Sequence, residues 1–125
     1  MKEELKLVKE FHRKFKVPVA EVPTLISKRR SSLRYELIKE EVEEYLTDGV
    51  NSLGGKDKKI ENIAKELADI LYTVYGTILE HGLQDKMEEV FLENHRSQMS
   101  KTYSPGKMIK DKGFQEVNLG KIFKK

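Results

Sequence analysis

The amino-acid sequence predicts an all-α fold, in which a four-helix-bundle-like region is followed by an irregular C-terminal tail. Apolar residues recur at three- and four-residue spacing in four successive segments between residues 3 and 99. No segment has a convincing strand pattern apart from a short hairpin in the tail. The chain has 125 residues, so we expect one helical domain over 1–125, with the bundle at about 1–101 and the tail at 102–125.

The first two helices are predicted on either side of a connector that contains two prolines. The first runs from about Glu3 to Lys16, and its apolar face is formed by Leu5, Val8, Phe11 and Phe15. The second is capped by Ser31 or Ser32 and ends near 47–49. Its residues form one apolar stripe, made of Leu33, Leu37, Ile38, Val42 and Tyr45.

Two further helices are predicted after the stretch NSLGGKDKK, which we interpret as a loop. The third helix is the longest and ends at about His81, where Gly82 is a natural C-cap. Its apolar face consists of Ile60, Ile63, Ala64, Leu67, Ile70, Leu71, Val74, Ile78 and Leu79. The fourth helix covers about 83–99. Three glycines and a proline follow within 103–125, a segment that is not obviously helical.

Composition excludes several classes of protein. No apolar run approaches the roughly 20 residues that a membrane span requires, so we expect a soluble protein with no membrane partner. The N-terminus lacks the apolar core of a signal peptide, which indicates the cytoplasm. The net charge of +3 is spread unevenly, with basic and acidic segments alternating, so nucleic acid is an unlikely partner. Because the chain has no cysteine, any metal must be held by oxygen or imidazole.

An acidic turn in the second helix is the first candidate for a functional site. The stretch LIKEEVEEYL places Glu41 near the centre of the apolar stripe, with Glu44 one turn along and about 60° to the side. Glu36 and Glu43 lie on the other side, where a solvated helix surface explains them. For Glu40 a surface role and a functional role are equally plausible. An inward carboxylate is costly unless a cation neutralises it.

The third helix supplies a complementary pair of acids. Glu66 and Asp69 lie one turn apart on the flank of its apolar face, and the short uncharged side chains of Thr73 and Thr77 continue the same line. Two antiparallel helices would gather four carboxylates around a small volume. A hard divalent cation offsets their repulsion, and magnesium, with manganese as a substitute, is the expected cofactor.

The sequence also resembles a known family. The stretch EEVEE, followed after a loop by KELADILY, is similar to the paired acidic signature of the MazG-like all-alpha nucleoside triphosphate pyrophosphohydrolases, which include phosphoribosyl-ATP pyrophosphohydrolase relatives. EFHRKFKVPV and EVFLENHRSQMSK extend the resemblance over most of 8–101. It implies that the magnesium ligands are Glu41, Glu44, Glu66 and Asp69. Position 98 departs from the pattern, because Gln98 stands where these relatives usually have asparagine.

Candidate substrate-binding residues lie in the second and fourth helices. Asn94 and Gln98 occupy an apolar register, where a buried, satisfied amide is as plausible as a substrate contact for Asn94. Lys101 follows one turn later and is expected to bind phosphate. Arg34, two turns before Glu41, either pairs with acids or meets a phosphate. The three histidines are interpreted as surface or helix-end residues, and His95 is the strongest candidate among them for a functional role.

These observations predict a magnesium-dependent hydrolase that converts an NTP or dNTP to the monophosphate and pyrophosphate. Glu41 or Glu40 would accept the proton of the attacking water, while Arg34 and Lys101 hold the phosphates. No P-loop motif is present. The alternative is a catalytically inactive helical module for dimerisation or nucleic-acid binding. Apolar faces that a small bundle cannot cover, together with the resemblance, predict a homo-oligomer, either a dimer or a tetramer, with the tail packed near the cleft or onto the neighbour.

Overall fold

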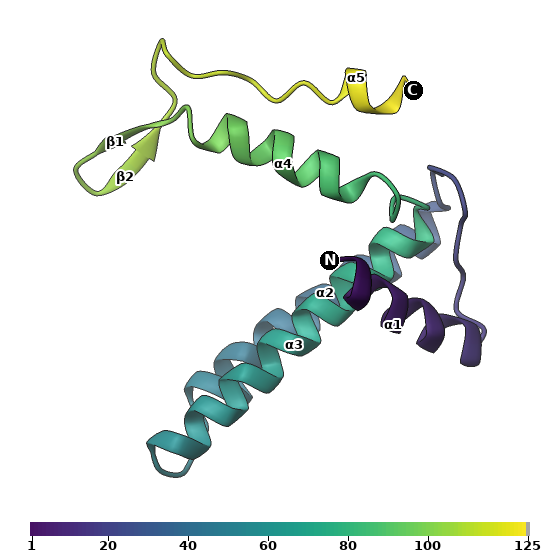
Figure 1. Cartoon of the computed structure of the whole chain (residues 1–125). Coiled ribbons are helices and arrows are strands. Elements are labelled where there is room, and N and C mark those ends of the chain that lie inside the picture. Colours follow the sequence, from purple (N-terminus) through teal and green to yellow (C-terminus); the bar gives the residue numbers. More distant parts are fainter. Residues whose placement is uncertain (125) are drawn as a thin grey trace. The chain divides into compact units, whose positions relative to one another are not determined.

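The computed structural model describes residues 1–124 and confirms an all-α fold (Figure 1). The chain divides into two compact units, Met1–Gln84 and a second that begins at Asp85. The first unit contains three α-helices and one π-helical segment, which are α1 (Lys2–Lys14), α2 (Lys28–Glu44), η1 (Tyr45–Val50) and α3 (Lys56–Glu80). In the described part of the chain, every helix is too short or too polar to cross a bilayer.

An antiparallel pair of helices forms the centre of the first unit. Helix α2 continues into η1, the chain turns back, and α3 runs in the opposite direction alongside both (Figure 1). Helix α1 packs against α3. The most deeply buried apolar side chains of this unit, all but inaccessible to solvent, come from these two helices and are Leu5, Val8, Ile78 and Leu79. The core therefore lies at the C-terminal end of α3.

A buried ionic anchor joins α2 to the same end of α3. The Glu80 carboxylate is fully buried and accepts two hydrogen bonds from Arg30, at 3.0 Å from Nε and 2.7 Å from Nη2. The Nη1 atom of Arg34 lies 3.2 Å from the same carboxylate, and its Nε donates to Thr77 Oγ1 at 3.0 Å. Gly76 leaves the room for this arrangement, because a Cβ there would lie 2.5 Å from Arg34 Nη2. Removing one partner of such a buried pair is strongly destabilising.

The connector between α1 and α2 lies against the C-terminus of α3. The backbone N–H of Ala20 donates to the Leu79 carbonyl at 2.9 Å. Gly82 ends the helix with φ +65°, and a Cβ at this position would lie only 2.0 Å from the Val22 carbonyl oxygen. Both the left-handed conformation and the close approach of the connector therefore require glycine at this position.

The second unit consists of one α-helix, a hairpin and a short terminal helix. These elements are α4 (Met87–Gln98), β1 (Thr102–Ser104), β2 (Lys107–Ile109) and α5 (Gly120–Phe123). The two strands pair antiparallel, with Thr102 opposite Ile109. This confirms the predicted hairpin in the tail.

The buried side chain of Glu93 on α4 binds residues of the C-terminal segment. Glu93 accepts two hydrogen bonds from Arg96, at 2.9 and 2.7 Å, and one from the backbone N–H of Asn118 at 2.7 Å. The Lys121 ammonium lies 3.4 Å from the other oxygen. The hydrogen bonds from Arg96, followed by that from Asn118, lower the pKa of Glu93 to about 2. These contacts hold residues 118–121 against α4, while packing of the tail near the cleft or onto a neighbouring subunit stays a prediction.

The start of α2 differs from the sequence prediction. The helix begins at Lys28, and Ser27 is its cap, since the Ser27 hydroxyl accepts a hydrogen bond from the Arg30 N–H at 3.1 Å. The predicted caps Ser31 and Ser32 lie inside the helix. Three consecutive basic residues before them gave no pattern of apolar spacing, although such residues are compatible with a helix.

Other boundaries shift for similar reasons. Helix α3 begins at Lys56, inside the stretch predicted as a loop, and α4 begins at Met87 because the preceding residues form a turn. Helix α1 ends at Lys14, two residues before the predicted Lys16. The predicted end of α3 before Gly82 is confirmed. The short helix α5 was not predicted.

Burial departs more clearly from the prediction. Ile78 and Leu79, on the predicted apolar face of the third helix, are buried within the first unit. Phe11 and Phe15, on the predicted apolar face of the first helix, are exposed instead. His12 is buried rather than at the surface, because it continues the line of Leu5 and Val8 along α1.

Candidate metal centre

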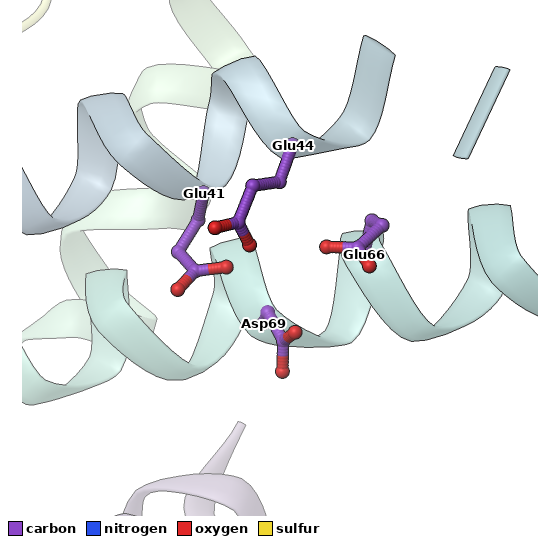
Figure 2. A group of neighbouring side chains, drawn as sticks. All are labelled: Glu41, Glu44, Glu66 and Asp69. Carbon is purple, nitrogen blue, oxygen red and sulfur yellow. The ribbon is translucent and has the colours of Figure 1, made fainter. Parts of the chain in front are cut away.

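Four carboxylates from α2 and α3 meet on the facing sides of the helix pair (Figure 2). Glu41 and Glu44 occupy the last turn of α2, while Glu66 and Asp69 occupy one turn of α3. One oxygen from each lies within 4.8 Å of the others. The structure therefore brings together all four residues that the sequence predicts as metal ligands.

Close packing of the helices near η1 shapes this cluster. A Cβ on Gly49 would be in ordinary van der Waals contact, 3.5 Å from the Ile63 Cα and 3.6 Å from the Glu66 Cγ, so the segment after Glu44 packs against α3. π-Helical turns inside helices are rare and frequently accompany functional sites. Here η1 continues α2 directly beyond Glu44 and keeps the glutamates beside α3.

The carboxylates are poorly compensated by protein groups. Glu66 is only 5% exposed. Within residues 1–124, the Oε2 atoms of Glu41 and Glu66 are buried without a hydrogen-bond partner. Burial, followed by the charge of Glu44, raises the pKa of Glu41 to about 7. Both effects disfavour the charged form of the carboxyl group.

One lysine offsets part of the charge. The Lys65 ammonium lies 2.7 Å from Asp69 Oδ2 and 3.9 Å from Glu66 Oε1. The hydrogen bond to Asp69 raises the pKa of Lys65. Because this lysine is mostly exposed, the pair contributes little to stability. Sequence reasoning did not identify Lys65, although its position four residues before Asp69 on the helix was a usable signal.

The donor set fits a hard divalent cation. Magnesium prefers oxygen ligands and binds through carboxylates while keeping positions for water and for substrate phosphates. Two buried oxygens without partners and four mutually repelling carboxylates are the features that such an ion would satisfy. The residues present therefore fit the predicted cofactor.

The remaining predicted residues lie elsewhere in the chain. Glu40 is exposed and is not one of the four clustered acids. Arg34 is buried, and its guanidinium is already engaged by Glu80, by Thr77 and by the carbonyl of Thr73. The structure therefore places it in an ion pair, while a contact with phosphate stays a prediction.

The substrate-binding residues predicted near the fourth helix belong to the second unit. Asn94 and Gln98 lie on α4 and are exposed, so neither is the buried amide considered as an alternative. Lys101 lies just beyond the helix. His95 is exposed on the same helix. Their contact with substrate stays a prediction.

A pocket of about 400 Å³ lies in the first unit, one helical turn from the acids. Leu37 precedes Glu41 by four residues on α2, and Thr73 follows Asp69 by four residues on α3; both line the pocket. Its size is within the range of small-molecule sites. The first unit thus places a carboxylate cluster and a mainly apolar pocket along the same pair of helices.

Comparison with known proteins gives one family. The family model described as phosphoribosyl-ATP pyrophosphohydrolase matches residues 8–98, which is more than half of the chain. The matched span contains all four clustered acids. No curated protein matches the chain.

Glu41→Gln is expected to stabilise the metal-free protein above neutral pH. The folded-state pKa of about 7 exceeds the ordinary 4.5, so the folded state binds the extra proton between these values. The free energy of unfolding of the wild type should therefore fall as pH rises from about 4.5 to 7, by up to about 3 kcal/mol from the titration of Glu41. Above this range it should level off. Denaturant unfolding in EDTA across this range measures the effect.

Comparing Glu41→Gln with the wild type separates the effect of the Glu41 titration on stability from that of His12. Burial lowers the pKa of His12, which changes stability in the opposite direction over part of the same range but equally in both proteins. Glu36→Gln, an exposed glutamate on the same helix, is the matched control. A constant difference in stability between Glu41→Gln and wild type at all pH values would contradict the prediction.

Proposed function

Because the chain belongs to the phosphoribosyl-ATP pyrophosphohydrolase family, whose members are hydrolases acting on phosphoric anhydrides, we propose that it cleaves nucleoside triphosphates with magnesium as cofactor. The bond cleaved is that between the α and β phosphates, and the products are a nucleoside monophosphate and pyrophosphate. The observation that carries this proposal is the four-carboxylate cluster with two buried, unpartnered oxygens. Manganese, which prefers the same oxygen donors, is expected to substitute.

The arrangement of the first unit supports a division of roles. When bound, magnesium supplies positive charge that offsets the charge of the reacting phosphates. The ligands proposed for it are Glu41, Glu44, Glu66 and Asp69. The attacking water loses its proton to Glu41 or to its neighbour Glu40, which acts as general base.

The substrate is proposed to lie along the helix pair. Its triphosphate lies at the acids, and its base enters the pocket one turn away, where Phe11, Leu37 and Tyr72 supply apolar surface. Arg34 adds positive charge behind this pocket while it stays bound to Glu80. For Asn94, Gln98 and Lys101, which belong to the second unit, a contact with the substrate stays a prediction.

An exposed apolar groove supports assembly into a homo-oligomer. Between α1 and α3 lies a groove of about 200 Å³ whose lining includes Leu7, Val8, Leu71 and Tyr75. Leu7 is 60% and Leu71 is 51% exposed. Contiguous apolar surface of this kind marks interaction sites, and a two-fold dimer is the commonest way to cover it. We therefore propose a dimer or tetramer of this chain.

Product analysis tests the reaction. Incubation of the purified protein with ATP, phosphoribosyl-ATP and other triphosphates plus magnesium should yield pyrophosphate and the monophosphate, identified by chromatography and ³¹P NMR. Glu66→Gln should lower kcat by at least about a hundredfold, because a catalytic metal contributes several kcal/mol to the transition state.

The control for this variant is Glu61→Gln, an exposed glutamate on α3 that should leave kcat unchanged. Release of orthophosphate as the first product would place the enzyme in another class of hydrolases. Wild-type rates in both Glu66→Gln and Asp69→Asn would refute the ligand assignment.

Light scattering at micromolar concentration tests the assembly. Wild type is expected to have the mass of a dimer or tetramer, and Leu71→Glu should reduce it to a monomer because a buried charge opposes association. Leu53→Glu, in the exposed loop before α3, is the matched control and should not change the mass. A monomeric wild type would rule out the proposed oligomer.

A further inference from the structure

The pocket beside the acids has two different kinds of wall. Phe11 and Tyr72 lie edge to face, with ring centroids 5.4 Å apart, and together with Leu33 and Leu37 they form apolar surface. These side chains suit the flat face of a nucleotide base. The other wall carries cationic side chains from the end of α1 and the start of α2.

The cationic wall has more positive charge than its acid neutralises. Arg30 and Arg34 both line the pocket and share the single carboxylate of Glu80. Lys16 adds a third cation. His12 also lines the pocket, but burial lowers its pKa, so it is mostly neutral at pH 7. An apolar pocket with surplus positive charge is suited to a ligand that bears an anionic group.

Lys16 is the cation that is free to bind. Within residues 1–124, its ammonium has no hydrogen bond or ion pair, whereas both arginines are engaged by Glu80. Neighbouring lysines of α1 already have contacts: Lys14 lies over the Phe15 ring, and Lys9 pairs with an acid of the connector. Among the cations that line the pocket, Lys16 is therefore the one whose hydrogen-bond donors are available to a ligand.

The backbone of Lys16 is unusual for its residue type. Its φ is +59°, and Lys16 is the only non-glycine residue with positive φ in the described chain. Helices commonly end in this left-handed conformation, but glycine is the usual residue because a Cβ is disfavoured there. Strained residues of this kind cluster at ligand-binding sites. Lysine at this position is thus unfavourable for the backbone but places an ammonium at the pocket.

We propose that Lys16 is a specificity-determining residue that binds an anionic group on the base of the nucleotide, at the end remote from the triphosphate. Phosphoribosyl-ATP, an ATP whose base carries a phosphoribosyl group, has such an anion, and ATP lacks it. The inference rests on the proposed function and adds to it the side chain that distinguishes these two classes of substrate. The triphosphate of either nucleotide lies at the four clustered acids, so selectivity between ATP and phosphoribosyl-ATP arises at the pocket.

Kinetics with the two nucleotides tests the inference. Wild type should have a higher kcat/KM for phosphoribosyl-ATP than for ATP. Lys16→Met should lower kcat/KM for phosphoribosyl-ATP by about tenfold or more, mainly through KM, because a hydrogen bond between charged groups is lost. The same variant should change kcat/KM for ATP little. Lys16→Arg should retain most of the preference, and the matched control Lys14→Met should retain all of it.

Lys16→Gly separates a functional from a structural role. Glycine accepts the left-handed conformation, so this variant should have a Tm equal to or above that of wild type while it loses the preference for phosphoribosyl-ATP. A wild-type preference in both Lys16→Met and Lys16→Gly would overturn the inference. So would an absence of preference in the wild-type enzyme.

Binding distinguishes failure of this inference from failure of the proposed reaction. The shift in Tm that each nucleotide gives in EDTA is compared, since repulsion between the triphosphate and the acids is the same for both. A larger shift with phosphoribosyl-ATP that depends on Lys16 supports the inference even if no nucleotide is hydrolysed. Hydrolysis of triphosphates with equal shifts in Tm refutes the inference and leaves the proposed reaction intact.

Discussion

The antiparallel pairing of α2 with α3 is the constraint on which the rest of the first unit depends. At one end the buried Glu80 carboxylate binds Arg30 and Arg34, and at the other η1 packs against α3. Anchored at both ends, the helices have one register, and the acids between the anchors face one another. The pocket next to the acids depends on the same pairing, since Arg34 forms part of its wall.

The two sets of acids in this helix pair, Glu80 and the four clustered carboxylates, differ in how far nearby cations compensate their negative charge. Glu80 is compensated within the chain by two guanidinium groups, so its burial fixes the fold. Within residues 1–124, the exposed Lys65 is the one cation paired with the four clustered acids, and burial together with the charge of Glu44 raises the pKa of Glu41. Uncompensated charge at a buried position lowers the stability of the metal-free protein and provides affinity for a cation. This difference supports the proposal that the four clustered acids bind a cation.

The sequence was sufficient to predict the four acids because helical periodicity determines which residues share a face. Glu41 and Glu44, and likewise Glu66 and Asp69, are one turn apart within single helices, so their alignment is a local property. The pairing of Glu80 with Arg30 joins residues 50 apart, and no local pattern reports such a contact.

Burial could not be predicted for the same reason, because it depends on which helices cover each face. The N-cap of α2 is Ser27 rather than Ser31, so the helix begins earlier than predicted. The basic residues between these two serines gave no pattern of apolar spacing that would have indicated this.

The most direct test of the central claim is a titration of Mn²⁺ into the protein, followed by the EPR signal of the free ion. Wild type should bind Mn²⁺, and Mg²⁺ should displace it. Glu66→Gln should weaken binding by at least about tenfold, whereas the exposed Glu61→Gln should not change it. Equal Mn²⁺ affinity in wild type and Glu66→Gln would contradict a metal centre at these four carboxylates.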